Sequence, residues 1–174
     1  MISALKRSEA VFKHVTPLPA DSPAPLSIKD ALTLLKLDHR YIEDLFAQYE
    51  IAYSEDSKQQ LVAEICEQLT QHIFLEENIL YPAVRPMLGN HQLLDVAMEG
   101  NTGMQWLIKE LQTEPFGSVL CSARIVLLNE NFKKHVKMQE TQLFPKIRRS
   151  SMDLNVLGRI LQAAKASLRH EVAH

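Results

Sequence analysis

Two segments of this 174-residue sequence place a histidine four residues before a carboxylic acid or its amide. The first is HIFLEENILYP at residues 72–82, and the second is HVKMQETQLFP at residues 135–145. Both close on Leu, an aromatic residue and Pro, but the fourth position after the histidine is Glu76 in the first and Gln139 in the second. Imidazole and carboxylate groups are common protein ligands of transition metals. The first segment therefore carries a candidate ligand pair, and the second carries an incomplete copy of it.

A histidine and a glutamate one helical turn apart are often only an exposed pair, worth a few tenths of a kcal/mol. Here the pair interrupts an apolar seam with the alternating three- and four-residue spacing of a buried helix face. This seam consists of Ile65, Leu69, His72, Glu76, Ile79 and Ala83. An unsatisfied buried polar group costs about 1–3 kcal/mol on mutational scales, and an unpaired carboxylate costs more. We therefore expect a shared partner for the two groups, and a cation is suited to both.

The elements that must position these groups are helices. A proline-rich stretch at residues 17–25 predicts an extended arm or linker. After it, caps, prolines and periodicity predict five helices, at residues 27–53, 56–85, 90–112, 118–144 and 153–169. Ser27 is the predicted N-cap of the first helix, Pro86 and Gly89 end the second, and Pro145 either kinks or ends the fourth. The sequence therefore predicts an all-α chain.

Three further helices have seams like that of the second. The predicted inward positions are Leu32, Leu35, His39, Ile42 and Phe46 in the first helix, Leu94, Ala97, Asn101, Met104, Ile108 and Leu111 in the third, and Ile125, Leu128, Phe132, His135 and Gln139 in the fourth. Each seam is apolar except near one level. We therefore expect six polar side chains to meet inside a four-helix bundle, namely His39, His72, Glu76, Asn101, His135 and Gln139.

An internal repeat relates the two halves of this predicted bundle. His72 and His135 are 63 residues apart, and DHRYIEDLF at 38–46 aligns with GNTGMQWLI at 100–108, with apolar residues on apolar residues. The chain reads as two helical hairpins of one design, each built to supply a histidine and then a His-x-x-x-Glu pair. The first hairpin is complete, with His39, His72 and Glu76. The second keeps His135 but has Asn101 and Gln139 at the other two positions.

The segments LKLDHRYIEDLF, HIFLEENILYPAVR and HVKMQETQLFPKIR make the chain similar to the hemerythrin-like family, the HHE cation-binding domain, over about residues 28–148. The resemblance implies an up-and-down four-helix bundle that holds two irons bridged by oxygen and two carboxylates. It also implies oxygen binding, iron or oxygen sensing, or defence against nitrosative or oxidative stress. Carried over by position, the ligands are His39, His72, Glu76 and His135, whereas Asn101 and Gln139 depart from the family pattern.

The departures predict one metal position rather than two. His39, His72 and Glu76 form a two-histidine, one-carboxylate set that suits Fe(II), Mn(II) or Zn(II), and His135 can approach as a fourth ligand. Iron is the metal expected from the resemblance. The second position has lost an anionic bridge and an imidazole, so we expect it to be weak or absent. Among the nearby acids, Glu140 is expected to be solvated or to lie outside the ligand set.

Composition and charge limit the partners and the cellular location that the chain is expected to have. Net charge is −2, which provides no field for nucleic acid or an anionic membrane, and no apolar run is long enough for a membrane span. The first 14 residues lack the apolar core of a secretory signal, so a cytoplasmic location is expected. Cys66 and Cys121 are expected to be buried free thiols. We predict an arm at 1–26, a hemerythrin-like bundle at 27–150, and a C-terminal helix packed on the bundle at 151–174.

Three functional interpretations follow from the sequence. The first is a metal-binding protein that senses, carries or scavenges metal, oxygen or reactive species, with a metal ion and a small diatomic molecule as partners. The second is a metal-free bundle that binds another protein, in which Asn101 and Gln139 hydrogen-bond to His135 and its neighbours. The third is a mononuclear oxidative enzyme, for which the sequence provides no substrate pocket, so a non-enzymatic role is favoured. A homodimer that uses the N-terminal arm is a further expectation.

Overall fold

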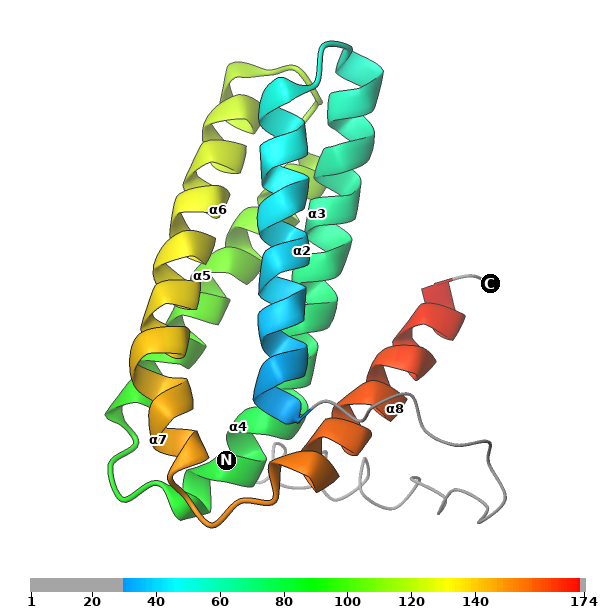
Figure 1. The fold of residues 1–174 in the computed structure, drawn as a ribbon. Coiled ribbons are helices and arrows are strands. Elements are labelled where there is room, and N and C mark those ends of the chain that lie inside the picture. The colour runs from blue at the N-terminus through cyan, green and yellow to red at the C-terminus, as the bar shows by residue number, and fades with distance from the viewer. Residues whose placement is uncertain (1–29, 173–174) are drawn as a thin grey trace.

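The computed structural model describes residues 30–172, and their side chains as far as residue 168. Within this range every regular element is helical (Figure 1). The elements are α2 (Ala31–Ile51), α3 (Glu55–Leu75), the π-helical turn η1 (Glu76–Leu80), α4 (Tyr81–Val84), the 3-10 turn η2 (Arg85–Met87), α5 (Gln92–Thr113), α6 (Val119–Met138), the π-helical turn η3 (Gln139–Leu143), α7 (Phe144–Arg148) and α8 (Leu154–Val172). The predicted arm and the docking expected of it lie outside the described residues.

Side-chain caps fix the starts of three long helices. Asp30 accepts a hydrogen bond from the Thr33 backbone N–H at 3.0 Å, so α2 begins at Ala31, and the predicted cap Ser27 lies outside the described residues. Ser54 and Ser118 cap α3 and α6 in the same way. Short connections then force neighbouring helices to run antiparallel.

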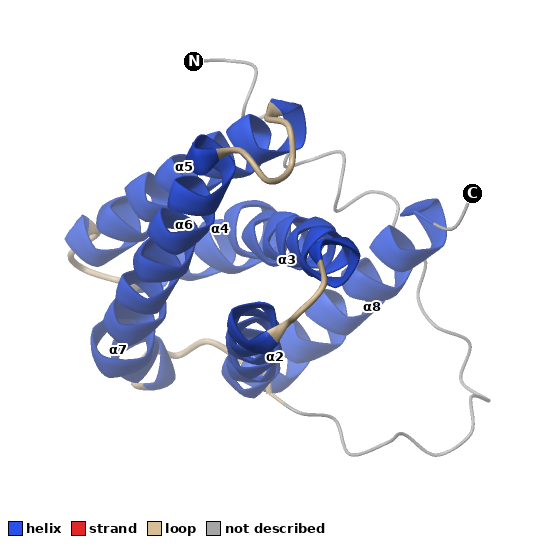
Figure 2. Ribbon diagram, turned by 90° about the horizontal axis from the view of Figure 1, so that it is seen from above, coloured by secondary structure: helices blue, strands red, loops and turns tan. Residues whose placement is uncertain are grey.

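The four long helices α2, α3, α5 and α6 form an up-and-down bundle, which Figure 2 shows end on. Helix α8 packs outside this bundle against α2 and α3. The predicted fold, an up-and-down four-helix bundle with an additional C-terminal helix, is confirmed. The division of the chain at residues 26 and 150 stays a prediction. Among residues 30–172, none of the helices combines the length and the hydrophobicity that a membrane span requires.

The two helices that carry the repeated segments each contain one π-helical turn, at η1 and η3. In these turns the backbone N–H of Tyr81 bonds to the carbonyl of Glu76, and that of Phe144 bonds to the carbonyl of Gln139. A proline is the second residue after each turn. Because a proline in a regular α-helix clashes with the carbonyl four residues before it, we attribute the wider turns to Pro82 and Pro145. The helix therefore continues through Pro145 to Arg148, instead of ending there.

Two apolar clusters fill the bundle, one on each side of a polar level. The first includes Ile42, Met104 and Phe132, and the second includes Leu35, Ala97 and Leu143, together with Leu157 and Leu161 from α8. Between them lie the six predicted polar side chains, which we call the polar layer: His39, His72, Glu76, Asn101, His135 and Gln139. All six are at most 5% exposed.

The predicted seams are buried with one exception. Ala83 is only half-buried, and its neighbours Tyr81 and Val84 face the core instead. The extra residue of the η1 turn rotates the helix after it, so the seam spacing read from the sequence fails beyond Leu80. Cys66 and Cys121 are buried free thiols, as expected, and burial raises the pKa of the Cys66 thiol to about 11.

Candidate metal centre

Glu76 occupies the middle of the polar layer and is fully buried. The Gln139 side-chain amide donates to Glu76 Oε1 at 2.6 Å, and the Asn101 amide donates to Oε2 at 3.1 Å. The Tyr81 hydroxyl also donates to Oε2, at 2.8 Å, and accepts from the Gln139 amide at 2.8 Å. The two neutral residues of the second hairpin therefore hold the carboxylate of the first. The metal-free interpretation expected these amides to bond to His135 and its neighbours, and the neighbour that they contact is Glu76, 3.4 Å from His135 Nε2.

Three histidines surround this carboxylate. His72 Nε2 lies 3.2 Å from Glu76 Oε1, and His135 Nε2 lies 3.4 Å from Oε2. Neither nitrogen is aligned for a hydrogen bond, although both are buried. Burial opposes ionisation of Glu76, but the two imidazoles outweigh it and hold the pKa of the carboxyl well below its ordinary value. The centre therefore contains one buried anion with imidazole nitrogens directed around it.

His39 completes the cluster from α2. Its Nδ1 lies 2.9 Å from Glu140 Oε1, and because a carboxylate only accepts, Nδ1 must carry the hydrogen. Glu140 is held in turn by Arg40 at 2.8 Å and contacts the outer nitrogen of His39. Burial, with His72 nearby, holds the pKa of His39 well below 6.5. A neutral ring with its hydrogen on Nδ1 leaves a lone pair on Nε2, which has no partner.

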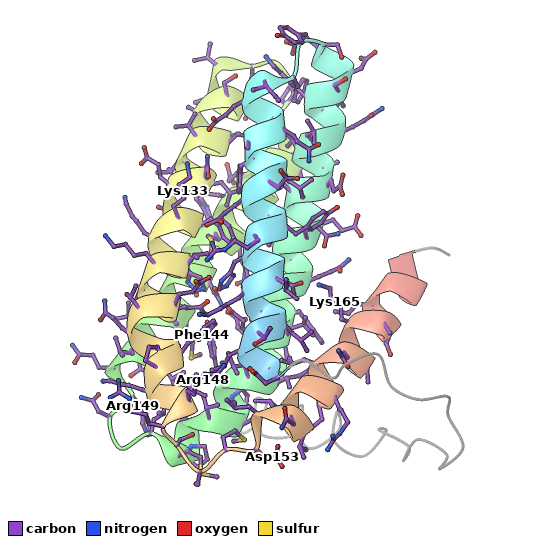
Figure 3. The ribbon with its side chains drawn as sticks, in the orientation of Figure 1. Lys133, Phe144, Arg148, Arg149, Asp153 and Lys165 are labelled. Carbon is purple, nitrogen blue, oxygen red and sulfur yellow. The ribbon has the colours of Figure 1, made fainter. Side chains whose placement is uncertain are left out.

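His72 has a carboxylate on its outer side as well. Asp38 Oδ2 lies 4.0 Å from His72 Nδ1, and the other Asp38 oxygen pairs with Lys165 of α8, whose position Figure 3 marks. Burial opposes the charged form of His72, but Glu76 and Asp38 outweigh it and raise its pKa to about 9. In the metal-free protein a proton on His72 therefore balances the charge of Glu76 at neutral pH.

His135 has no such outer partner. The position that aligns with Asp38 is Gly100, where an added Cβ would lie 3.1 Å from His135 Nδ1. Both nitrogens of His135 are buried without a hydrogen bond. The position that aligns with Tyr81 is Phe144, which points into the bundle (Figure 3) and stacks on His39 at 5.9 Å between ring centroids. The two hairpins thus differ around the polar layer as well as within it.

The residues present fit one metal ion. His39, His72 and Glu76 each offer a ligand atom, and these atoms lie within 4.8 Å of one another, which is the one such group in the described part of the chain. The unpartnered inner nitrogens of His39 and His72 are what a cation would satisfy. For a second ion, the layer offers His135 and the unpaired amide oxygens of Asn101 and Gln139. That set has no anion of its own and fits a second ion poorly.

The structure brings together all six residues that the sequence placed at one level, and it adds three that sequence reasoning missed. Tyr81 binds both Glu76 and Gln139, while Asp38 and Lys165 form the outer contacts of His72. The repeat could have pointed to Tyr81, because the equivalent position of the second segment is Phe144, and the hydroxyl group is the difference between the two side chains. No sequence signal pointed to Lys165, which lies 127 residues from Asp38.

Comparison with known proteins gives a consistent result. Residues 30–147 match the model of the hemerythrin HHE cation-binding domain. The fold is similar to the crystal structure of a hemerythrin HHE cation-binding-domain-containing protein from Mycobacterium kansasii, with a TM-score of 0.70 and 20% identity, covering 82% of this chain and 89% of that one. The sequence is 24% identical over 141 residues to a DNA nickase of Nostoc sp., covering 80% of this chain but only 40% of that protein. This chain therefore spans about two fifths of the length of that relative. Since the family model covers more than half of its residues, the chain belongs to the hemerythrin HHE cation-binding domain family.

Proposed function

We propose that this chain binds one transition metal ion, iron in the first place and manganese or zinc as alternatives, through His39, His72 and Glu76. His135 is the fourth donor. The metal serves in sensing, carrying or scavenging of metal, oxygen or reactive species, with a small diatomic molecule as the second partner. The observation that carries the proposal is the set of buried imidazole nitrogens that surround Glu76 without hydrogen-bond partners.

The free-energy cost of buried polar atoms without partners favours a bound cation at this site. Each buried polar atom without a partner costs about 1–3 kcal/mol, and the inner nitrogens of three histidines share this condition. Glu140 orients His39 so that the lone pair of Nε2 remains available. A metal ion when bound supplies open coordination positions for a small ligand. The chain itself fixes the donors, excludes water from them and keeps one carboxylate ionised.

A second candidate function is a metal-free bundle that binds another protein. It is favoured by the hydrogen bonds that Tyr81, Asn101 and Gln139 donate to Glu76, because they satisfy the carboxylate without a metal. A proton on His72 would complete the charge balance. This arrangement would leave the inner nitrogen of His39 unsatisfied, so we place it second.

Metal analysis of protein purified without a histidine tag separates the two candidates. Elemental analysis after exposure to Fe(II) under anaerobic conditions should find one iron per chain that survives gel filtration. The His72→Ala variant, purified in parallel, controls for iron held elsewhere. Iron retained equally by both proteins, or by neither, would contradict the proposed centre.

A further inference from the structure

A groove of about 270 Å³ lies beside the incomplete half of the polar layer, along α5 and α6. Gly100 and Gly103 contribute to it from α5, and Lys134 and His135 contribute from α6. A water molecule takes about 30 Å³ in the liquid, so the groove has room for more than one water. The absence of side chains at the two glycines opens this space.

A buried polar group faces the groove. His135 is only 5% exposed, and its Nδ1 has no hydrogen-bond partner. An added Cβ on Gly100, which itself lines the groove, would lie 3.1 Å from this atom. The opposite ring nitrogen, Nε2, lies 3.4 Å from Glu76 inside the polar layer. His135 therefore spans from the centre to the groove wall, with an unsatisfied nitrogen on the outer side.

In the α2–α3 hairpin, a carboxylate occupies the position equivalent to the space beside His135. There the counterpart of Gly100 is Asp38, whose carboxylate lies 4.0 Å from His72 Nδ1 and pairs with a lysine of α8. Beside His135 the structure provides a lysine, Lys134, and a space, but no carboxylate on Gly100. Histidines that bind metal through one nitrogen nearly always donate the other N–H to an acceptor, and a carboxylate is a common one.

We propose that the groove binds a small monocarboxylate anion of the acetate class, which takes the place of the side chain that Gly100 lacks. One oxygen of the anion accepts a hydrogen bond from His135 Nδ1, and its charge pairs with Lys134. The amide of Asn131 on the groove wall is a further donor, whereas the carboxylate of Glu99 opposes an anion. The inference rests on the proposed function, because Nδ1 carries the hydrogen when Nε2 is turned to the metal.

The test uses the full chain loaded with zinc, which is diamagnetic, and labelled with ¹⁵N at histidine. Metal content is measured first. Acetate is then added at constant ionic strength against chloride, and the Nδ1 signal of His135 is followed. We expect a saturable shift at His135 and none of that size at His39 or His72. Lys134→Gln should weaken acetate binding about fivefold, and Glu99→Gln should strengthen it by a similar factor.

Two variants control for indirect effects. Gly103→Leu fills the groove, and since an added Cβ there meets nothing within 4 Å, the fold should remain and the response to acetate should disappear. Gly103→Ala adds little bulk and should retain the response. Lys133→Gln removes the neighbouring lysine of α6 (Figure 3), which is not part of the groove wall, and should leave the affinity unchanged.

The outcomes separate the two proposals. A shift that fails to saturate, or that persists in Gly103→Leu, would mean that the groove holds only water, and it would overturn the inference while leaving the metal centre intact. A chain that takes up no zinc would be recognised from its metal content before acetate is added. That result would overturn the proposed function and this inference with it.

Discussion

The α2–α3 and α5–α6 hairpins of the bundle have similar backbone structures but differ in the charged side chains that they place at and beside the polar layer. In both, a π-helical turn begins at the position that holds Glu76 in one half and Gln139 in the other, and both keep an acid at the next position, Glu77 and Glu140. The α2–α3 hairpin has Asp38, His39 and Glu76 where the α5–α6 hairpin has Gly100, Asn101 and Gln139. The helix geometry is therefore alike in the two halves, whereas Asp38 and Glu76 have no acidic counterpart in the α5–α6 hairpin.

The neutral residues Asn101 and Gln139 of the second hairpin bind the carboxylate of the first. Gln139 and Asn101 both donate to Glu76, so they hold the carboxylate of the first hairpin in place. A glutamate at position 139 would place a second buried anion beside Glu76, which is costly without a metal to bridge the pair. The neutral half of the polar layer therefore supports the buried carboxylate of the other half through hydrogen bonds.

The largest difference between the halves should appear when histidines are removed. His72→Ala or Glu76→Gln should abolish metal binding, because each removes a donor and breaks the charge balance of the layer. His135→Ala should only weaken it. Iron per chain, measured after gel filtration, checks the ranking. Equal losses in His72→Ala and His135→Ala would mean that the two halves contribute alike.

Repairing the second hairpin should add a metal. Asn101→His together with Gln139→Glu restores an imidazole and an anionic bridge, and iron should rise to about two per chain with the near-ultraviolet bands of an oxygen-bridged ferric pair. Each single change should help little, since either leaves the second position short of a donor. A folded double mutant that stays colourless and binds one iron or none would show that these positions are not the other half of the centre.

Contacts on the outer side of the histidines should affect metal affinity in the α2–α3 hairpin only. Asp38→Asn removes the carboxylate beside His72 and should weaken metal binding by about 10–100-fold. Lys165→Gln should weaken it less, because the lysine acts through Asp38. Competition with a chelator measures both. In contrast, Lys134→Gln should have little effect on metal affinity in buffer without acetate, because no carboxylate then lies between Lys134 and His135. A large effect of Lys134→Gln would remove the predicted asymmetry.

Metal affinity should depend on pH through His72. Its pKa of about 9 in the metal-free protein means that the metal must displace a proton, so apparent zinc affinity should rise about tenfold per pH unit between about pH 7 and 9 and then level off. The same raised pKa stabilises the metal-free fold fully below about pH 6.5, and this contribution is lost as the pH rises through about 9. Calorimetry should detect about one proton released per zinc at pH 7. Binding without proton release would contradict this assignment.

Sequence reasoning predicted the bundle and the polar layer because both depend on helical periodicity. The seams through His39, Asn101 and His135 are buried as their spacing predicted. The repeat supplied the pairing of the halves and the two departures from the ligand pattern. These features are local in sequence, or recur at a fixed separation, and they can be read without coordinates.

The features that were missed depend on backbone detail or on distant contacts. Ala83 was placed in the core because the π-helical turn that rotates the helix cannot be read from apolar spacing alone. Lys165 reaches Asp38 only because α8 crosses α2 and α3, and no pattern in the chain specifies that crossing. The sequence also could not predict that Glu76 accepts hydrogen bonds from both amides, since several polar partners lie at the same level.

The most direct test of the asymmetry between the halves is the number of iron ions bound per chain in tag-free protein, measured by elemental analysis under anaerobic conditions. Wild-type protein should hold one iron per chain, lost in His72→Ala. Two tightly held irons in the wild-type protein, or one iron retained after His72→Ala, would contradict a centre built on the α2–α3 hairpin.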